Sequence, residues 1–307
     1  MKTLVLEKMP DKFWILVKER KLNNEIIPYS DSVDKLKIDA LIIRTRTICD
    51  KNFINQYPNV KLVIRAGTGY DNIDIRYLHK LGVLVCNTLN ANAHSAFEHT
   101  LALILSAMKQ MNSSRNNILN GKWKKDLPYN LEFEDLKVLI VGVGRIGTKL
   151  ADALKYFNAS IKGVDPYLTE SQKSAKGISF INYEDGLKWA NLITYHCPLT
   201  KETFHYFNMN SLQLISEPII LINVSRGSVV DENAINFGLA NNKFIAVGLD
   251  VYEHEPVSKN HFKDYKNVLF TPHTGAFTSK AKERMSFETL DVLSNFINGR
   301  KLYSEIL

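Results

Sequence analysis

Cysteine is scarce in this sequence: Cys49, Cys86 and Cys197 are the only three among 307 residues, and they lie far apart. An odd number at this spacing forms neither a disulfide framework nor a metal-ligand motif. We therefore expect no metal site, and a reducing cytoplasm is the simplest setting.

Long apolar runs are also missing. The run from Leu101 to Met108 is too short to span a bilayer. The opening residues, MKTLVLEKMPDKF, contain one brief apolar segment that Glu7 and Lys8 break, which is unlike a secretory signal. The sequence predicts a cytoplasmic protein with no membrane partner.

Positive charge is in excess, but it is not concentrated in one stretch of the sequence. Lysine and arginine total 39 against 32 acidic residues, and the formal net charge is +7. These basic residues are spread along the chain, so a nucleic-acid partner is not expected, although a basic binding module stays a competing hypothesis. An anionic cofactor and an anionic substrate would use the same positive field.

Short apolar runs alternate with helix-compatible segments over most of the chain, which is typical of parallel sheets covered by helices. Two such series are separated by one long helical pattern from Ala93 to about Leu119, with a break near residues 112–114. A final helix covers about 279–298. The expected strands are 3–7, 39–44, 61–66, 82–87, 137–141, 160–164, 192–196, 219–224, 246–250 and 268–272. The fold class is therefore α/β, with two doubly wound parallel-sheet domains.

A glycine-rich turn opens the second series. Gly142, Gly144 and Gly147 follow a predicted strand and lead into a predicted helix, and Asp165 ends the next strand. Such glycines permit a tight turn, close approach of a pyrophosphate and close helix packing. Asp165 would accept ribose hydroxyls and repel a 2′-phosphate, so the pattern predicts NAD rather than NADP. Arg145, inside the turn, would compensate the negative charge of the diphosphate.

Three stretches further along carry polar residues where strands end. Arg226 follows one strand, a group of carboxylates that includes Glu255 follows the next, and His273 follows the last. An arginine can hold a substrate carboxylate and polarise the neighbouring carbonyl, and a histidine can exchange the hydroxyl proton. A carboxylate paired with the histidine would orient it. The combination predicts hydride transfer between NAD and a 2-hydroxy acid.

These stretches, GVGRIG, NVSRGSVVDENAI, LDVYEHEP and PHTGAFT, occur in that order with IRAGTGYDNID and FEHTLALIL. Together they resemble the D-isomer-specific 2-hydroxyacid dehydrogenase family over about residues 39–295. The resemblance implies a flavodoxin-like substrate domain, 1–92 plus 279–307, and a Rossmann NAD domain, 93–278, with the active site in the cleft between them. It also implies a homodimer through the NAD domain.

The resemblance also assigns roles by motif position. Arg226 matches the catalytic arginine, Glu255 the carboxylate that pairs with the histidine, and His273 the general acid/base. Thr68 and Gly69 match a loop that binds the substrate carboxylate through its N–H groups, and Asp250 matches the partner of the nicotinamide carboxamide. The positions that match the lining of the cofactor are Gly142, Gly144, Arg145, Ile146, Gly147, Asp165, Cys197, Pro198, Val224, Ser225, Asp250, Thr68, Gly275 and Ala276.

Some residues depart from the family pattern. Leu89 stands where proline is common, and Phe97 stands where a small residue is usual. Three histidines, His94, His99 and His196, have no place in the family's mechanism, and we expect them to be structural or interfacial.

Within the family, the stretch from Val63 to Asn92 most resembles the D-3-phosphoglycerate dehydrogenases. Arg44, Arg65 and Asn92 match positions that hold the phosphate end of that substrate, and Arg46 is a fourth candidate. The chain ends just after the last predicted helix, so a short form without an appended regulatory domain is expected.

Other interpretations stay open. Arg44 and Arg65 could instead pair with carboxylates such as Asp71 or Asp74. The enzyme could then be a reductase of glyoxylate, hydroxypyruvate or another 2-keto acid. A hypothesis from a different class is an NAD(H)-sensing binding protein of the corepressor type.

Overall fold

The computed structural model describes residues 1–22, 26–30, 32–124, 127, 130–258 and 261–306. The chain divides into two compact units. Unit 1 comprises Met1–His94 and Ala276–Leu307, and unit 2 comprises Ser95–Gly275. None of the helices in the described ranges is long and apolar enough to cross a membrane.

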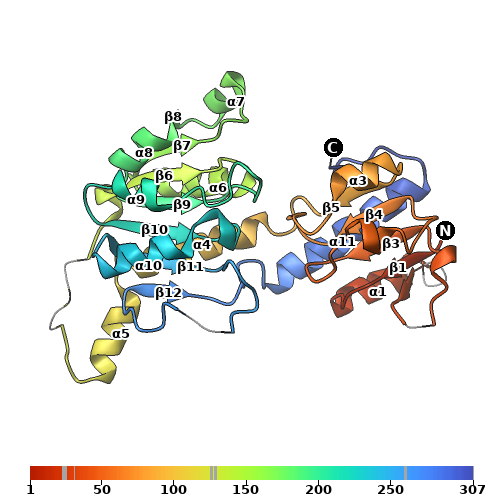
Figure 1. The fold of residues 1–307 in the computed structure, drawn as a ribbon, viewed down its shortest axis with the longest axis horizontal. Coiled ribbons are helices and arrows are strands. Elements are labelled where there is room, and N and C mark those ends of the chain that lie inside the picture. The colour runs from red at the N-terminus through yellow and green to blue at the C-terminus, as the bar shows by residue number, and fades with distance from the viewer. Residues whose placement is uncertain (23–25, 31, 125–126, 128–129, 259–260, 307) are drawn as a thin grey trace. The chain divides into compact units, whose positions relative to one another are not determined.

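Unit 1 is a five-stranded parallel sheet covered by helices on both faces (Figure 1). The strand order is β2-β1-β3-β4-β5, the flavodoxin-like order of a doubly wound sheet. The strands are β1 (Thr3–Val5), β2 (Ile26–Pro28), β3 (Ala40–Ile43), β4 (Leu62–Arg65) and β5 (Leu84–Asn87).

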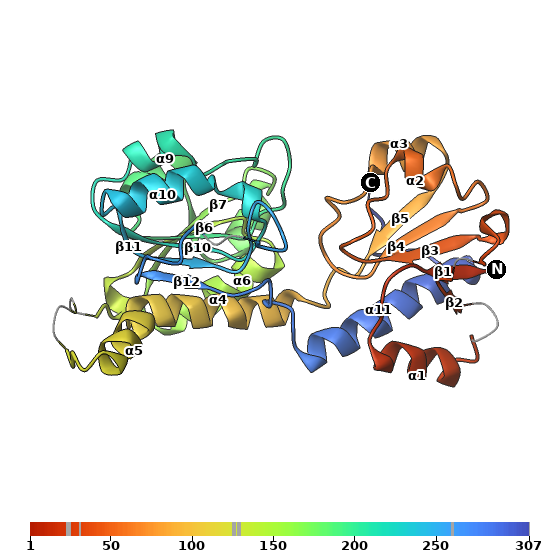
Figure 2. The ribbon, with the colours of Figure 1, turned by 60° about the horizontal axis from the view of Figure 1, so that its bottom comes forward.

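The two faces of this sheet are buried by different helices. α1 (Asp11–Glu19) and α11 (Ser279–Ile297) pack on one face, while α2 (Lys51–Ile54) and α3 (Ile75–Lys80) pack on the other (Figure 2). Every residue of β3 and β4 is buried, which explains why these strands read as continuous apolar runs. A short 3-10 turn, η1 (Lys35–Lys37), leads into β3.

Unit 2 is a seven-stranded parallel sheet in the order β12-β11-β10-β9-β6-β7-β8. Counted from β6, this is the order of a dinucleotide-binding sheet with one strand added. The strands are β6 (Lys137–Val141), β7 (Ser160–Val164), β8 (Ser179–Phe180), β9 (Leu192–Tyr195), β10 (Ile219–Asn223), β11 (Phe244–Leu249) and β12 (Val268–Phe270).

Helices cover both faces of this second sheet as well. α4 (Ala93–Met108) and α6 (Arg145–Tyr156) pack on one face, and α8 (Tyr183–Trp189), α9 (Met209–Gln213) and α10 (Glu232–Ala240) on the other (Figure 2). The remaining elements of the unit are α5 (Met111–Leu119), α7 (Glu170–Ala175), η2 (Phe133–Asp135) and η3 (Gly227–Val229). The predicted α/β class with two doubly wound parallel sheets is confirmed.

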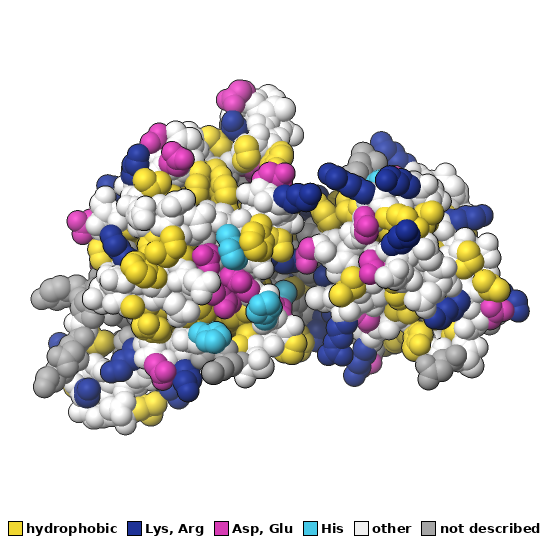
Figure 3. Space-filling view, in the orientation of Figure 1, with side chains coloured by type: hydrophobic (Ala, Val, Ile, Leu, Met, Phe, Trp, Pro, Cys, Tyr) yellow, Lys and Arg dark blue, Asp and Glu magenta, His cyan; other side chains and the backbone are white. Residues whose placement is uncertain are grey.

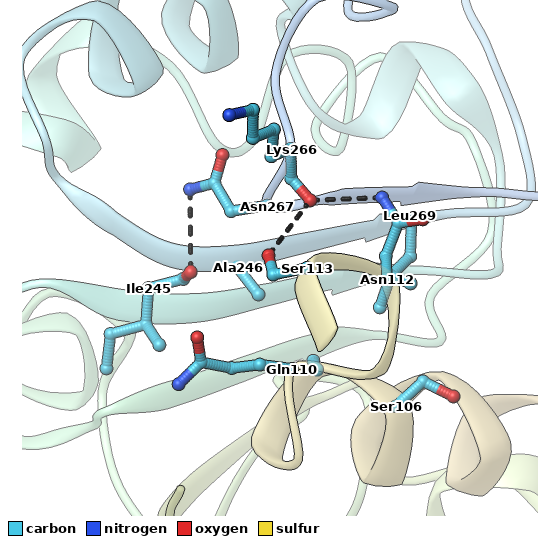
Figure 4. Close-up of a pocket in the computed structure, with 10 residues that line it drawn as sticks. Ser106, Gln110, Asn112, Ser113, Ile245, Ala246, Lys266, Asn267 and Leu269 are labelled. Atoms are coloured by element: carbon cyan, nitrogen blue, oxygen red, sulfur yellow. Dashed lines mark hydrogen bonds between the residues drawn. The ribbon is translucent and has the colours of Figure 1, made fainter. Parts of the chain in front are cut away.

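The long helix expected from Ala93 to Leu119 is interrupted, and the break precedes the predicted position at 112–114. α4 ends at Met108, and Gln110 takes a left-handed conformation before α5 begins. Asn112 and Ser113 then donate side-chain hydrogen bonds to the carbonyl of Lys266, at 3.0 Å and 3.3 Å (Figure 4). These bonds fix the start of α5 beside β12, so the chain has to turn at residues 109–110.

Two short strands were not predicted. β2 and β8 have three and two residues, and each lies at the edge of its sheet. β2 reads Ile-Ile-Pro and β8 reads Ser-Phe, so neither lies in a longer apolar run that sequence patterning can detect. All strands within each sheet are parallel, so their carboxyl ends lie along one edge, where ligands of doubly wound sheets bind.

Candidate active site

The glycine turn connects β6 to α6 in unit 2. Gly142 has φ +91°, and a Cβ there would lie 2.6 Å from the backbone nitrogen of Cys197. A Cβ on Gly147 would lie 2.3 Å from the carbonyl oxygen of Gly142. Only glycine fits at these two positions, because both backbones approach too closely for a side chain.

Gly144 has a different surrounding. It is exposed, and a Cβ there would meet nothing within 4 Å, so space is open at the beginning of α6. Gly144 is the N-cap of this 12-residue helix but provides no side-chain cap. The first N–H groups of α6 therefore lie beside this open space, Arg145 next to them is exposed, and Ile146 and Gly147 follow in the first turn. The arrangement fits a diphosphate.

Asp165 lies directly after β7 and holds the glycine turn. Its Oδ2 accepts the N–H of Val143 at 2.9 Å, and its Oδ1 accepts the N–H of Tyr167 at 3.2 Å. A carboxylate has about four acceptor sites. Acceptor capacity is therefore left for the hydroxyls of a ribose beside the turn.

Other predicted cofactor positions lie along the same edge of the sheet. Cys197 and Pro198 follow β9, and burial raises the pKa of the Cys197 thiol to about 12, so this cysteine is not a thiolate nucleophile. Val224 and Ser225 follow β10. The Ser225 hydroxyl donates to Asn223 Oδ1 at 2.9 Å, which fixes the turn that leads to Arg226.

Glu255 and His273 meet in unit 2, although 17 other residues separate them in the chain. His273 Nδ1 lies 2.6 Å from Glu255 Oε2, while Glu255 Oε1 accepts the N–H of Tyr252 at 3.1 Å. The carboxylate is thus fixed from one side and binds the imidazole with the other. The other ring nitrogen of His273 is left to exchange a proton, and both side chains remain partly exposed, at 41% and 31%.

Arg226 lies after β10, next to the strand that leads into the Glu255 loop. Its Nη1 donates to the carbonyl of Ser225 at 2.7 Å, and Asn223 donates to the carbonyl of Arg226 at 2.9 Å. A Cβ on the following Gly227 would lie 1.9 Å from the carbonyl carbon of Tyr252. The turn at Arg226 and Gly227 therefore packs directly on the loop that carries Glu255.

Asp250 is buried at the end of β11 and holds the segment that contains His273. Its Oδ1 accepts the N–H of Thr274 at 2.7 Å, and its Oδ2 accepts the N–H of Gly275 at 2.8 Å. Burial alone would raise the pKa of Asp250, but hydrogen bonds to the carboxylate, including one from His99, outweigh burial and lower it. Asp250 is therefore ionised at neutral pH.

In unit 1, the predicted substrate residue Arg65 lies against the loop that contains Thr68 and Gly69. It ends β4, is 8% exposed, and its guanidinium crosses directly over Gly67, where a Cβ would lie 1.4 Å from Nη1. Its Nη2 donates to Thr45 Oγ1 at 3.2 Å. The absence of a side chain at residue 67 lets this cation lie against the loop that contains Thr68 and Gly69.

That loop is fixed to the end of β5. Asn87 donates to the carbonyl of Thr68 at 2.7 Å, and Thr88 donates its N–H to the carbonyl of Gly67 at 3.2 Å. Asn92 is half-buried and lies directly before α4. Ala276, the last predicted cofactor residue, begins the second segment of unit 1.

Glu7 is a residue that sequence reasoning missed. It follows β1, and its carboxylate accepts the backbone N–H groups of Arg44, Arg46 and Thr47, at 2.7, 3.1 and 3.0 Å. Burial would raise the pKa of Glu7, but these bonds outweigh it and lower the pKa. Its only sequence signal is its place after a strand. Glu7 fixes the loop that carries two of the candidate arginines.

The two other arginines differ in their surroundings. Arg46 is exposed, whereas Arg44 is half-buried and donates through Nη1 to the carbonyl of Lys8 at 2.9 Å. Its Nε is buried, and no described residue accepts a hydrogen bond from it. Asp74, considered as a partner for these arginines, instead caps α3 by accepting the N–H of Tyr77.

Histidine and acidic side chains gather on the face of unit 2 that Figure 3 turns to the viewer. Besides the Glu255–His273 pair, His205 Nε2 lies 3.1 Å from Glu253 Oε1, with Asp231 near enough for all three to reach one cation. Glu253 also accepts the N–H of Glu232 at 2.9 Å, so this cluster fixes the start of α10. Burial lowers the pKa of His196 to about 3, which excludes it as a proton donor near neutral pH.

Comparisons with known proteins bear on the family to which the chain belongs. A family model described as "D-isomer specific 2-hydroxyacid dehydrogenase, NAD binding domain" matches residues 101–275. The chain is 34% identical to a D-3-phosphoglycerate dehydrogenase of Bacillus subtilis over 90% of its own length and 53% of that protein. It is 33% identical to a glyoxylate reductase of Thermococcus litoralis, over 86% of the chain and 82% of that protein.

Solved structures share the fold. A D-lactate dehydrogenase of Aquifex aeolicus, solved with NAD and lactic acid, superposes with a TM-score of 0.87 at 26% identity, covering 97% of this chain and 96% of that one. The chain spans about half the length of the phosphoglycerate dehydrogenases that it matches. The resemblance read from the sequence and the NAD cofactor are confirmed.

Proposed function

This chain belongs to the D-isomer specific 2-hydroxyacid dehydrogenase family, and from that premise we propose that it transfers a hydride between NAD and a D-2-hydroxy acid. The contact that carries the proposal is the one between His273 Nδ1 and Glu255 Oε2, at 2.6 Å. It lies on the same edge of the same sheet as Arg226 and the glycine turn. An acid/base pair, a carboxylate-binding cation and a dinucleotide turn together make this reaction possible.

In the direction of oxidation, the free ring nitrogen of His273 accepts the proton of the substrate hydroxyl. Glu255 keeps the ring oriented and stabilises the imidazolium that forms. Arg226 binds the substrate carboxylate and, in the reverse direction, polarises the carbonyl. NAD, when bound by Gly144, Arg145 and Asp165, supplies the hydride acceptor.

We expect Asp165 to decide the choice between NAD and NADP. The unmodified protein should have a higher kcat/KM with NADH than with NADPH, because Asp165 accepts ribose hydroxyls and repels a 2′-phosphate. Replacing it by Ser should erode this preference. Steady-state kinetics with both cofactors would measure the ratio, and equal kcat/KM values in the unmodified protein would contradict the assignment.

For the substrate we infer D-3-phosphoglycerate, which would be oxidised to 3-phosphohydroxypyruvate as in serine biosynthesis. Two observations support a second anion site. The Arg65 guanidinium is held over Gly67. The buried Nε of Arg44 donates a hydrogen bond to no described residue. Arg44 directly follows β3 and Arg65 ends the adjacent β4, and Glu7 after the neighbouring β1 fixes the loop that carries Arg44. The names of several relatives agree with this substrate.

Arg65→Ala tests the phosphate site. With NADH, kcat/KM for phosphohydroxypyruvate should fall by roughly 10- to 150-fold, because a charge-assisted contact of about 1.5–3 kcal/mol is lost. The value for hydroxypyruvate should change little. Arg20→Ala is a matched control, since Arg20 pairs with Asp291 on the surface of unit 1. Similar kcat/KM for both substrates, unchanged by Arg65→Ala, would leave no role for a phosphate site.

Reduction of glyoxylate, hydroxypyruvate or another unphosphorylated keto acid is the second candidate. It is favoured by the glyoxylate reductase relative, whose length the chain covers more fully than that of the phosphoglycerate dehydrogenases. A panel of keto acids mixed with NADH, followed by nicotinamide absorbance, distinguishes the candidates. If the protein binds NADH tightly but oxidises it with none of the keto acids, a corepressor-type sensor would be indicated instead.

We also infer a homodimer through the NAD-binding unit. α4 and α5 expose large apolar side chains that include Leu105, Met111, Ile118 and Leu119, between 37% and 65% exposed. Large apolar side chains exposed on two consecutive helices are consistent with an interaction surface. Light scattering at micromolar concentration should give about twice 35.0 kDa, and Met111→Asp combined with Ile118→Asp should halve that mass. A monomer in the unmodified protein would contradict the dimer.

A further inference from the structure

We propose that His99 is a positioning residue of the active site, which acts through Asp250 to hold His273 in place. Sequence reasoning treated His99 as a structural or interfacial histidine of α4. In the structure its Nε2 lies 3.0 Å from Thr271 Oγ1 and 3.3 Å from Asp250 Oδ1. The proposal rests on the roles proposed above for His273 and Glu255.

The hydrogens of this cluster can be assigned by counting donors. Thr271 has one hydroxyl hydrogen, and its 2.6 Å contact with Asp250 Oδ1 uses that hydrogen, since an ionised carboxylate only accepts. The hydroxyl oxygen must therefore accept from His99, 3.0 Å away. His99 Nε2 carries a hydrogen and points it at Thr271 and Asp250.

Asp250 in turn binds three consecutive N–H groups of the active-site segment. Its main-chain carbonyl accepts the N–H of His273 at 2.8 Å, and its carboxylate accepts those of Thr274 and Gly275, at 2.7 and 2.8 Å. His273 has φ +52°. This left-handed conformation is sparsely populated by residues other than glycine and persists where the surroundings fix it. Asp250 provides that fixation.

The carboxylate of Asp250 is 1% exposed, so each donor it loses leaves charge without compensation inside the protein. Thr271, Thr274 and Gly275 belong to the segment being held and move with it. His99 belongs to α4, on the apolar face that packs against the sheet, and is the donor from outside this segment. It fixes the carboxylate of Asp250 from the side of α4, and through that carboxylate it keeps His273 against Glu255.

Two amide substitutions separate this role from simple packing. In His99→Gln the side-chain amide can place an N–H near the position of Nε2, whereas in His99→Asn the same amide is one methylene shorter. We would measure hydrogen exchange of the cofactor-free protein by mass spectrometry, over residues 271–275 and over α4. His99→Asn and His99→Ala should exchange about tenfold faster at 273–275, as expected for one lost hydrogen bond to a charged group. His99→Gln should exchange at the parent rate.

Kinetics give the second measurement. kcat should fall by about tenfold in His99→Asn and His99→Ala and recover in His99→Gln. The pH profile of kcat in the two impaired variants should move to lower pH, because His273 is less often held by the Glu255 carboxylate that stabilises its protonated form. Two further polar side chains contact this segment, Glu255 at His273 and the Tyr252 hydroxyl at the carbonyl of Thr271, 3.2 Å away, and both are unchanged in all variants.

Several results would overturn the proposal. One is exchange and kcat at parent values in both His99→Asn and His99→Ala. Another is a Gln variant as impaired as the Asn variant, or a loss of rate by the same factor at every pH. If His99→Ala does not fold, the Gln and Asn pair decides. Full activity of His273→Ala would instead overturn the proposed function, so the two failures are distinguishable.

Discussion

Replacing His273 by alanine is expected to lower kcat by ~10²–10⁴-fold, the usual contribution of a positioned acid/base group. The proton of the substrate hydroxyl then has no side chain to accept it. NADH affinity should stay close to that of the parent, because the glycine turn and Asp165 lie at other strands of the sheet. Stopped-flow absorbance and NADH fluorescence would measure the two quantities.

The control for this variant addresses the backbone. Residue 273 has φ +52°, and asparagine tolerates that conformation better than alanine does. His273→Asn should therefore keep the local fold and be as inactive as His273→Ala. An asparagine variant with near-parent kcat would show that proton transfer occurs elsewhere.

Glu255→Gln examines the pairing itself. Glutamine can still accept the Nδ1 hydrogen of His273, but it has no charge to stabilise the imidazolium. The amide oxygen that accepts from His273 leaves the NH2 group facing the N–H of Tyr252, so that second contact is lost. The pH profile of kcat should move to lower pH, because the charge that favours the imidazolium is gone. A profile that overlays the parent's would mean that the 2.6 Å contact does not act in catalysis.

Arg226→Ala should have the second-largest effect, and it should change both kinetic constants. KM for the keto acid should rise because the carboxylate loses its cation. kcat should fall by ~10²–10³-fold, or about 2.7–4 kcal/mol, because polarisation of the carbonyl is lost as well. Steady-state kinetics over a range of keto-acid concentrations would separate the two effects.

Arg226→Lys is the matched variant, because lysine keeps the charge but cannot form the planar two-point contact. We expect it to recover part of the loss in KM and little of the loss in kcat. If Arg226→Ala leaves both constants at parent values, the arginine does not touch substrate, and its contact with the Ser225 carbonyl is its main role.

The sequence alone was sufficient for the fold class and for the residues of the glycine turn. Parallel strands that are buried on both faces are continuous apolar runs, so β3, β4 and β10 could be predicted from the sequence. The glycines at 142 and 147 were predictable because close backbone approach excludes every other residue. The edge strands β2 and β8 were not, since neither lies within a longer apolar run of the sequence.

Tertiary structure decided which side chains meet. The sequence placed Glu255 and His273 after two strands, and only the packed loops show Nδ1 facing Oε2. Nothing in the spacing could show that Glu7 would fix the loop of Arg44 and Arg46, or that His99 of α4 would reach Asp250. Local propensity and periodicity act over a few residues, whereas these contacts join segments that become neighbours only when the sheets and helices have packed.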